Sequence, residues 1–390
     1  MKTMIRSRLK FSLLFLIIGL LPMMLVSIIA TYSGSQDIKQ KVYNQLTAIN
    51  QIKKQAIKSY FKDRRSDMAV LSDTIETLSA QAYSKLANTQ DLKKAQIEDY
   101  LKSNQAQLHF LSSQQSVKNT LIEISQVFDN PIKWQQSLDT HDKDYANLLE
   151  LSGWNDFFLI NLEGDIIYSV MREGDLGQNL IKDLTQSSFN LAFSLSKASF
   201  TNKFTFADYL PYAPRNNEPA AFGVKPVEQE GQRIGYIAFQ QPIEKINEIL
   251  GHRAGMGATG KSYLVGQDHL MRSDSSLNPD IFSVSASFSN QNKLQTKAVN
   301  ESLAGRSDAG IIQDYNNKPV LSNWDYIELG DSHRWALISE IDVTEALNPK
   351  TSNGDEYYQH YIEHHGYYDL FLIQPDGYVF YSVKKDASLQ

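Results

Sequence analysis

The feature that most constrains this chain is a stretch of eighteen residues that occurs twice. Residues 153–170 read GWNDFFLINLEGDIIYSV and residues 366–383 read GYYDLFLIQPDGYVFYSV, so nine of the eighteen positions are identical. In each copy two β-favouring runs are joined by an acidic residue and a glycine, which predicts a tight hairpin because glycine takes positive φ without a clash. A looser copy, KSYLVGQDHLMRSD, lies at residues 261–274. The repetition indicates one hairpin-based module used several times.

A second constraint is the run from Phe11 to Ala30, which contains no charged side chain. As a helix it spans about 30 Å, the thickness of a bilayer core. Basic residues precede it, at Lys2, Arg6, Arg8 and Lys10. They place the N-terminus in the cytoplasm and everything from about Thr31 outside. A cleaved signal peptide is the alternative, but the apolar run is long for one and its end, Ile28-Ile29-Ala30, is bulky. We therefore expect an uncleaved membrane anchor.

Composition excludes several classes of protein. The net charge of −6 and the pI of about 5.8 argue against a nucleic-acid-binding surface. The chain has no cysteine, which excludes disulfides, thiolate metal sites and cysteine nucleophiles. Its 390 residues are enough for two or three domains.

Residues 33–150 are predicted to be helical. They contain a single glycine, Gly34, and apolar residues at helical spacing, and KKQAIKSYF at 53–61 is echoed by KKAQIEDYL at 93–101. Long amphipathic helices need a packing partner, either the β modules or a second chain. We interpret this stretch as a stalk, and its helices suggest a homodimer.

From about residue 151 the pattern changes to strands. After the first hairpin come a helical stretch at 176–199, strands at 204–209, 220–227 and 235–240, and a helix at 242–250. These elements predict a five-stranded antiparallel sheet with helices on one side. A second module repeats the plan, with strands after the middle hairpin at 310–315, 319–324 and 334–340, and residues 356–365 are expected to form a helix before the third hairpin.

Several segments in order resemble a known family of receptors. Residues 256–265 (MGATGKSYLV) and 270–274 (LMRSD) look like the membrane-proximal module of the double Cache (dCache) extracytoplasmic sensor region of bacterial methyl-accepting chemotaxis proteins. Residues 206–213 and 218–222 resemble strands of its membrane-distal module. The resemblance covers about residues 31–345. It implies a distal module that binds a small-molecule ligand and a signal that crosses the membrane through helices.

The resemblance leads to a fold class and a domain plan. We expect an α+β protein with an N-terminal transmembrane helix, a long helical stalk and tandem PAS-like (Cache) antiparallel sheets with flanking helices. The chain as given should cross a bacterial inner (plasma) membrane once, with its sensor region in the periplasm. The expected parts are a cytoplasmic tail and transmembrane helix (1–32), a stalk (33–150), a membrane-distal Cache module (151–250), a membrane-proximal Cache module (251–345), and a linker helix with the start of a further, truncated Cache module (346–390).

Two features depart from the family pattern. Family members continue into a second membrane helix, a HAMP or coiled-coil segment and a signalling domain, and none of these occurs in residues 1–390, so we expect a truncated chain or an incomplete reading frame. The Arg-x-Trp-Tyr pattern of amino-acid-binding members is also not visible, which argues against amino-acid sensing.

The predicted ligand pocket uses aromatic walls and a few polar groups. Five residues near strand ends are the candidates, Tyr168, Arg172, Asp208, Tyr209 and Tyr212. An aspartate such as Asp208 pairs with an ammonium group that tyrosine rings cover, whereas Arg172 suits a carboxylate. The alternative is that each tyrosine is a core residue with a solvated hydroxyl and that each charged residue lies on the surface. Arg272 and Asp274 are expected to tie the middle hairpin to its neighbours.

Other motifs do not predict chemistry. Residues 255–260 match GxGxxG, but a predicted helix precedes them and a strand follows, the reverse of a dinucleotide site. His360, His364 and His365 have metal-ligand spacing, yet a solvated linker helix explains them equally well. No HExxH or GxSxG motif occurs. We therefore predict no enzyme activity, no cofactor and no metal.

The function predicted from the sequence is ligand sensing by a transmembrane chemoreceptor. Two alternatives stay open. The same region occurs as the input of a sensor histidine kinase or a diguanylate cyclase, and a surface adhesin or scaffold is the reading without a ligand.

Overall fold

The computed structural model describes residues 2–145, 147–199, 201–330, 333–348, 356–373, 377 and 379–384. Contacts divide the chain into two units, Met1–Glu76 and Thr77–Gln390. Helix α1 (Lys2–Ser113) contributes residues to both units, and each unit is described by itself below.

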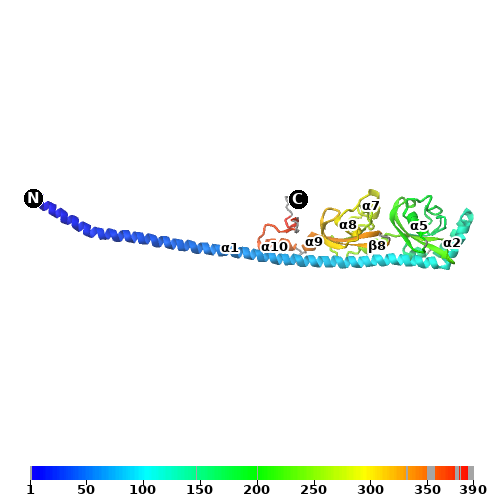
Figure 1. Cartoon of the computed structure of the whole chain (residues 1–390), viewed down its shortest axis with the longest axis horizontal. Helices are drawn as coiled ribbons and strands as arrows, with labels where there is room; N and C mark the ends of the chain where they lie inside the picture. The colour runs from blue at the N-terminus through cyan, green and yellow to red at the C-terminus, as the bar shows by residue number, and fades with distance from the viewer. Residues whose placement is uncertain are drawn as a thin grey trace. The chain divides into compact units, whose positions relative to one another are not determined.

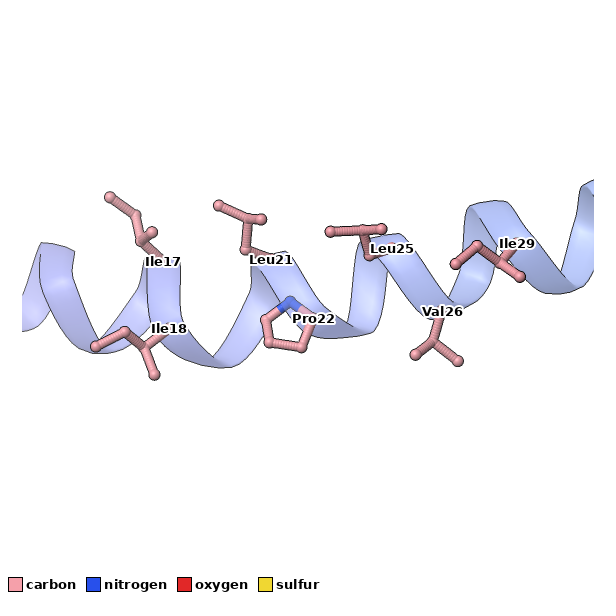
Figure 2. A pocket seen from close by; sticks show the side chains of 7 residues that line it. All are labelled: Ile17, Ile18, Leu21, Pro22, Leu25, Val26 and Ile29. Atoms are coloured by element: carbon pink, nitrogen blue, oxygen red, sulfur yellow. The ribbon is translucent and has the colours of Figure 1, made fainter.

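The first unit consists of the N-terminal part of α1. The apolar run lies within this helix, with Pro22 inside it and every side chain from Phe11 to Ala30 exposed. Figure 2 shows Ile17, Leu21 and Leu25 projecting in a row four residues apart. This segment is long and apolar enough to cross a membrane, by length and composition. Apolar side chains that are exposed in this way require lipid or another protein surface as their surroundings.

The second unit contains a five-stranded sheet, which we call the first sheet. Its strand order is β2-β1-β5-β4-β3 and all its pairings are antiparallel, which confirms the sheet expected after residue 151. Its strands are β1 (Asp156–Ile160), β2 (Ile166–Ser169), β3 (Thr205–Tyr212), β4 (Glu218–Gln229) and β5 (Gln232–Gln241). Glu230 and Gly231 both have positive φ, 51° and 79°, and join β4 to β5 in the turn that the acidic-glycine pair predicts.

Helices cover both faces of the first sheet, so the expectation of helices on one side is wrong. Helix α5 (Ser188–Ala198) packs on the face that carries Phe158 and Ile160 (Figure 1). Helix α2 (Gln115–Val127), together with Leu138 of α3 (Pro131–Tyr145), packs against Phe157 and Leu159 on the other face. The reason lies in β1 itself, whose five residues are all buried and do not alternate with polar ones.

A four-stranded antiparallel sheet, which we call the second sheet, follows in the same unit. Its order is β6-β9-β8-β7. Its strands are β6 (Lys261–Val265), β7 (Asp308–Gln313), β8 (Pro319–Gly330) and β9 (His333–Asp342). The helices around it are α6 (Glu244–Gly251), α7 (Val284–Asn290), α8 (Lys297–Leu303) and α9 (Val343–Leu347). Strand for strand, β6, β9, β8 and β7 correspond to β1, β5, β4 and β3 of the first sheet.

The middle hairpin differs from its prediction. Its second run forms only an isolated bridge, Val265 with Met271, instead of a strand. The Ser273 hydroxyl accepts a hydrogen bond from the Leu264 amide at 2.9 Å, so a side chain takes the place of a backbone partner and ends the ladder there. The second sheet accordingly has one strand fewer than the first.

The last part of α1, from Thr77 to Ser113, lies alongside both sheets of the second unit (Figure 1). Gln90 donates to the Leu337 carbonyl of β9 at 3.2 Å. Lys93 donates to Ser262 of β6 at 3.0 Å. Asn104 accepts a hydrogen bond from Trp154 at 3.1 Å, just before β1. One helix therefore contacts elements of both sheets within a short stretch of sequence.

The third hairpin also forms, as predicted. Strand β10 (Phe371–Ile373) pairs with β11 (Val379–Ser382), and the register of Phe371 with Ser382 matches that of Phe158 with Ser169 in the first hairpin. Most of its turn, Gln374-Pro375-Asp376 and Tyr378, lies outside the described residues.

A helix ends immediately before each of these two hairpins. Helix α4 (Leu148–Ser152) ends at Gly153 and α10 (Tyr357–His365) ends at Gly366. Both glycines have left-handed backbone angles, with φ of 72° and 67°, which glycine adopts without strain. The two copies therefore share their helix cap as well as their hairpin.

Candidate functional site

The five residues predicted to line a pocket are dispersed. Asp208 and Tyr209 lie at a bulge in β3, where the register shifts between Ala207 and Leu210, and they are directed at the second sheet. The Asp208 carboxylate lies 2.9 Å from Arg272 Nε and accepts a hydrogen bond from Trp335 at 3.0 Å. Asp208 is thus already paired with a cation of its own chain, and Arg272 ties the middle hairpin to its neighbour as expected.

Tyr168 and Arg172 lie beside the helices on the other face of the first sheet. Tyr168 is fully buried against Tyr145 of α3, at a ring distance of 5.3 Å. Arg172 forms ion pairs with Asp139 at 2.9 Å and Asp142 at 2.7 Å, both also on α3. These two residues and Asp208 do not share a cavity.

Tyr212 is the predicted residue that donates a hydrogen bond to a buried acidic group without a salt bridge. Its ring packs 4.9 Å from Phe222 beneath α5, and its hydroxyl donates to Asp175 Oδ2 at 2.6 Å. Further rings complete this wall, since Phe189 stacks on Phe222 at 4.3 Å and lies 4.8 Å from Phe158. Burial, followed by the charge of Asp175, holds the pKa of Tyr212 above its ordinary value, so its hydroxyl keeps its proton and acts as a donor.

A second buried carboxylate, Asp156, lies close to this pair. Asp156 Oδ2 accepts from the Ser169 hydroxyl at 2.6 Å, and Oδ1 accepts from the Met171 amide at 3.1 Å. Burial raises the pKa of Asp156 to about 7, in spite of these hydrogen bonds, and the charge of Asp175 adds to the shift. We call Asp156, Asp175 and Tyr212 the acid cluster.

No salt bridge joins the acid cluster to a cation among the described residues, although the charge of Arg215, which is paired with Glu173, acts on Asp175. Neither Asp156 nor Asp175, each 1% exposed, forms an ion pair with any residue that the structure describes. Asp175 Oδ1 also has no hydrogen-bond partner among the described residues. Burial raises the pKa of Asp175 although Tyr212 donates to it. Buried carboxylates are normally paired, so two without a cation at an aromatic wall mark the candidate site of the first sheet.

Of the three residues of the acid cluster, the sequence analysis named Tyr212 but not Asp156 or Asp175. One signal for Asp156 was present, because Asp369 stands at the same place in the third hairpin. Asp369 accepts from the Ser382 hydroxyl at 2.8 Å and from the Lys384 amide at 3.2 Å, which repeats the contacts of Asp156. No comparable signal marks Asp175, which lies in a loop that has no second copy.

The GxGxxG segment has the surroundings expected from its sequence. Helix α6 precedes it and strand β6 follows it. Its backbone donors are occupied, because the Glu345 carboxylate accepts from the Ala258 amide at 2.6 Å and from the Thr259 amide at 2.7 Å. A carboxylate of the chain itself therefore holds the position that a phosphate would need.

Comparison with known proteins gives structural matches only. The sequence matches no protein-family model and no characterised protein. One similar solved structure is the ligand-binding domain of the Pseudomonas fluorescens chemoreceptor CtaA with L-serine, with 14% identity over 65% of this chain and 93% of that one and a TM-score of 0.42. A second is the ligand-binding domain of the Pseudomonas aeruginosa amino-acid chemoreceptor PctB with L-Gln, with 15% identity over 69% of this chain and 94% of that one and a TM-score of 0.43. A third is the V. cholerae histidine kinase DctB sensor domain, with 10% identity over 67% of this chain and 97% of that one and a TM-score of 0.44.

All three are sensor or ligand-binding domains. This is the class of protein named by the resemblance of residues 31–345.

Proposed function

We propose that this chain is the ligand-sensing region of a membrane-anchored chemoreceptor and that it binds a small ammonium-bearing molecule in the module of residues 151–250, at the acid cluster. The observation that carries the proposal is the pair of buried carboxylates without a cation beside Tyr212.

The chemistry of the acid cluster fits a cation. Burying an ionised carboxylate is costly unless an opposite charge accompanies it. An ammonium group supplies that charge and donates to Asp175 Oδ1, which has no other hydrogen-bond partner among the described residues. Phe189 and Phe222, stacked on each other at 4.3 Å, form an apolar wall beside Tyr212. Helix α5 and the loop before it cover the cluster, so binding requires them to move.

Strand β3 supports a route for the signal. It carries Tyr212 at its end in the acid cluster and Asp208 at the bulge, where the carboxylate binds Arg272 of the second module. A ligand that shifts Tyr212 therefore acts on the contact between the two sheets. The ligand shifts this equilibrium only as far as its affinities for the two states differ.

The remaining parts of the proposal concern location and assembly. The apolar helix anchors the chain in the bacterial inner membrane with residues 151–345 in the periplasm, in keeping with the basic residues that precede it. Two copies pair through their stalk helices, whose exposed apolar residues between residues 33 and 76, such as Ile49 and Ile57, need a partner.

The test is thermal unfolding of the full chain in detergent micelles with a panel of primary amines, diamines and quaternary ammonium compounds. A ligand at 100 times its Kd should stabilise the protein by about 2.7 kcal/mol. In Asp175→Asn and in Tyr212→Phe, the ligand concentration that produces the same stabilisation should be at least ten times higher. Glu163→Gln, which changes an exposed carboxylate of the same sheet, is the matched control and should keep the shift. No shift with any compound, or an unchanged shift in Asp175→Asn, contradicts the proposal.

A further inference from the structure

A second buried charge cluster lies in the second sheet, away from the acid cluster. The Lys261 ammonium lies 2.7 Å from Asp314 Oδ2 and 3.2 Å from Glu340 Oε1. It also lies 4.1 Å from the centre of the Tyr315 ring. The lysine side chain is 7% exposed and the two carboxylates are each 1% exposed. We call these four residues the Lys261 cluster.

Without its lysine, the cluster has the composition of an ammonium-binding site. It offers two carboxylates and the face of a tyrosine ring, the groups that hold ammonium ligands in proteins. Phe282 packs 4.3 Å from Tyr315, and Tyr263 lies 5.4 Å from it, so aromatic side chains support the wall. The carboxylates come from β9 and from the loop after β7, and the lysine reaches them from β6.

The cluster has more capacity to bind a cation than the lysine uses. Glu340 Oε2 and the Tyr263 hydroxyl are buried, and apart from their interaction with each other they have no hydrogen-bond partner among the described residues. Burial raises the pKa of Glu340 to about 7, against the opposing charge of Lys261. Burial also opposes the charge of Lys261, but Glu340, Tyr315 and Asp314 together hold its pKa above the ordinary value.

The position of Lys261 in the fold corresponds to a residue of the candidate site. Lys261 is the first residue of β6 and pairs with Glu340 of β9. Asp156 is the first residue of β1 and pairs with Gln240 of β5, the strand equivalent to β9. The two modules thus place a lysine and an aspartate at the same point of the sheet, each among aromatic side chains and carboxyl groups.

We propose that the second module contains a binding site for a primary alkylammonium group and that the side chain of Lys261 occupies it as a tethered ligand. The occupied site holds β6, β9 and the loop after β7 in the arrangement that a free ligand would otherwise have to stabilise. This inference does not depend on the acid cluster, because the Lys261 cluster and the acid cluster share no residue.

The experiment restores the missing group in trans. Lys261→Ala removes the three outer methylene groups and the ammonium, which n-propylammonium replaces atom for atom. In the full chain in detergent micelles, 100 mM n-propylammonium chloride should raise the unfolding midpoint of Lys261→Ala by about 3 °C more than that of the wild type. Equal concentrations of 1-propanol and of sodium chloride should produce no such difference.

Lys93→Ala is the matched control variant. Lys93 is also a buried lysine, but its ammonium donates to the Leu250 carbonyl and to Ser262 and has no carboxylate partner in the described part of the chain. Its removal therefore leaves a space without charge, and n-propylammonium should not stabilise Lys93→Ala beyond the wild type. An equal gain in Lys93→Ala shows a general effect of the amine and overturns the proposal.

A Lys261→Ala protein that fails to fold tests the proposal equally well. The chain has four tryptophans, and Trp324 and Trp335 are buried in the second sheet, so tryptophan fluorescence reports its folding. Recovery of the folded emission on addition of n-propylammonium, and not of 1-propanol, supports the tethered-ligand site. No recovery, or no additional stabilisation when the variant does fold, overturns it.

Discussion

The acid cluster and the Lys261 cluster occupy equivalent places in the two sheets but balance their charges differently. In the second sheet the chain supplies the cation itself, with Lys261 between Asp314 and Glu340. In the first sheet Asp156 and Asp175 are equally buried and have no ion pair with a described residue. The comparison shows that one fold position carries a salt-bridged lysine in the second sheet and an aspartate without a salt bridge in the first. Under the two proposals, the second sheet holds a filled ammonium site and the first takes its cation from outside.

The largest expected effect comes from removing the internal cation. Lys261→Met leaves two buried carboxylates without a partner and should lower the free energy of unfolding by about 3–5 kcal/mol. Asp175→Asn removes a carboxylate that has no cation and keeps an acceptor for Tyr212, so it should cost less than about 1 kcal/mol without ligand.

Urea unfolding of the full chain in detergent micelles measures both changes. Lys182→Met changes an exposed lysine in the loop between β2 and α5; it is the control and should leave stability nearly unchanged. Similar losses for Lys261→Met and Asp175→Asn would show that the two clusters do not differ in the way described.

A smaller effect separates the two copies of the hairpin. Asp156→Ala leaves the buried Ser169 hydroxyl and the half-buried Met171 amide without their acceptor and should cost about 2–3 kcal/mol. Asp369→Ala removes the same contacts from a two-stranded hairpin whose Phe371 and Ile373 are 43% and 58% exposed, and should cost less than about 1 kcal/mol. Chemical unfolding of the two variants in parallel provides the measurement, and equal losses would refute this distinction.

The smallest effect is the pH dependence of ligand affinity. Ser169, Asp175, Tyr168 and Tyr212 surround Asp156, whose pKa burial raises to about 7. The folded chain then holds a proton that the unfolded chain, with a pKa of about 3.9, has released, so this group's contribution to stability declines as pH rises from about 4 to 7. An ammonium ligand prefers the ionised form, and its affinity should rise about tenfold between pH 6 and pH 8.

Calorimetric titration at several pH values checks this expectation. Asp156→Asn should have a pH-independent affinity over the same range, if the variant still binds. An affinity that falls with rising pH would assign the site to an anion instead.

Much of the sheet architecture could be predicted from local sequence. The acidic-glycine turns and the alternation of β-favouring residues identified the first and third hairpins and the turn at Glu230-Gly231, because these structures depend on neighbouring residues. The coverage of both sheet faces was missed, although the apolar run of β1 carried the signal.

The candidate site was harder to predict. Asp208 and Tyr209 were expected in a pocket, but a bulge in β3 turns them toward the second sheet, and a bulge has no distinct sequence signature here. Asp175 approaches Tyr212 only because the loop between β2 and α5 returns to the end of β3. Lys261 and Glu340 meet through the pairing of two strands far apart in sequence, which no local pattern encodes.

The carboxylate that closes each hairpin also bears on the order in which the chain folds. In the first hairpin Asp156 reaches only as far as the Met171 amide, a separation of 15 residues. Closing so short a loop costs little entropy, and hairpins of this kind form within about 1–10 μs. The pairing of Asp156 with Gln240 has to wait for a much longer segment. We therefore expect the repeated hairpins to form before the long-range strand pairs, which then determine which hairpins become part of a complete sheet.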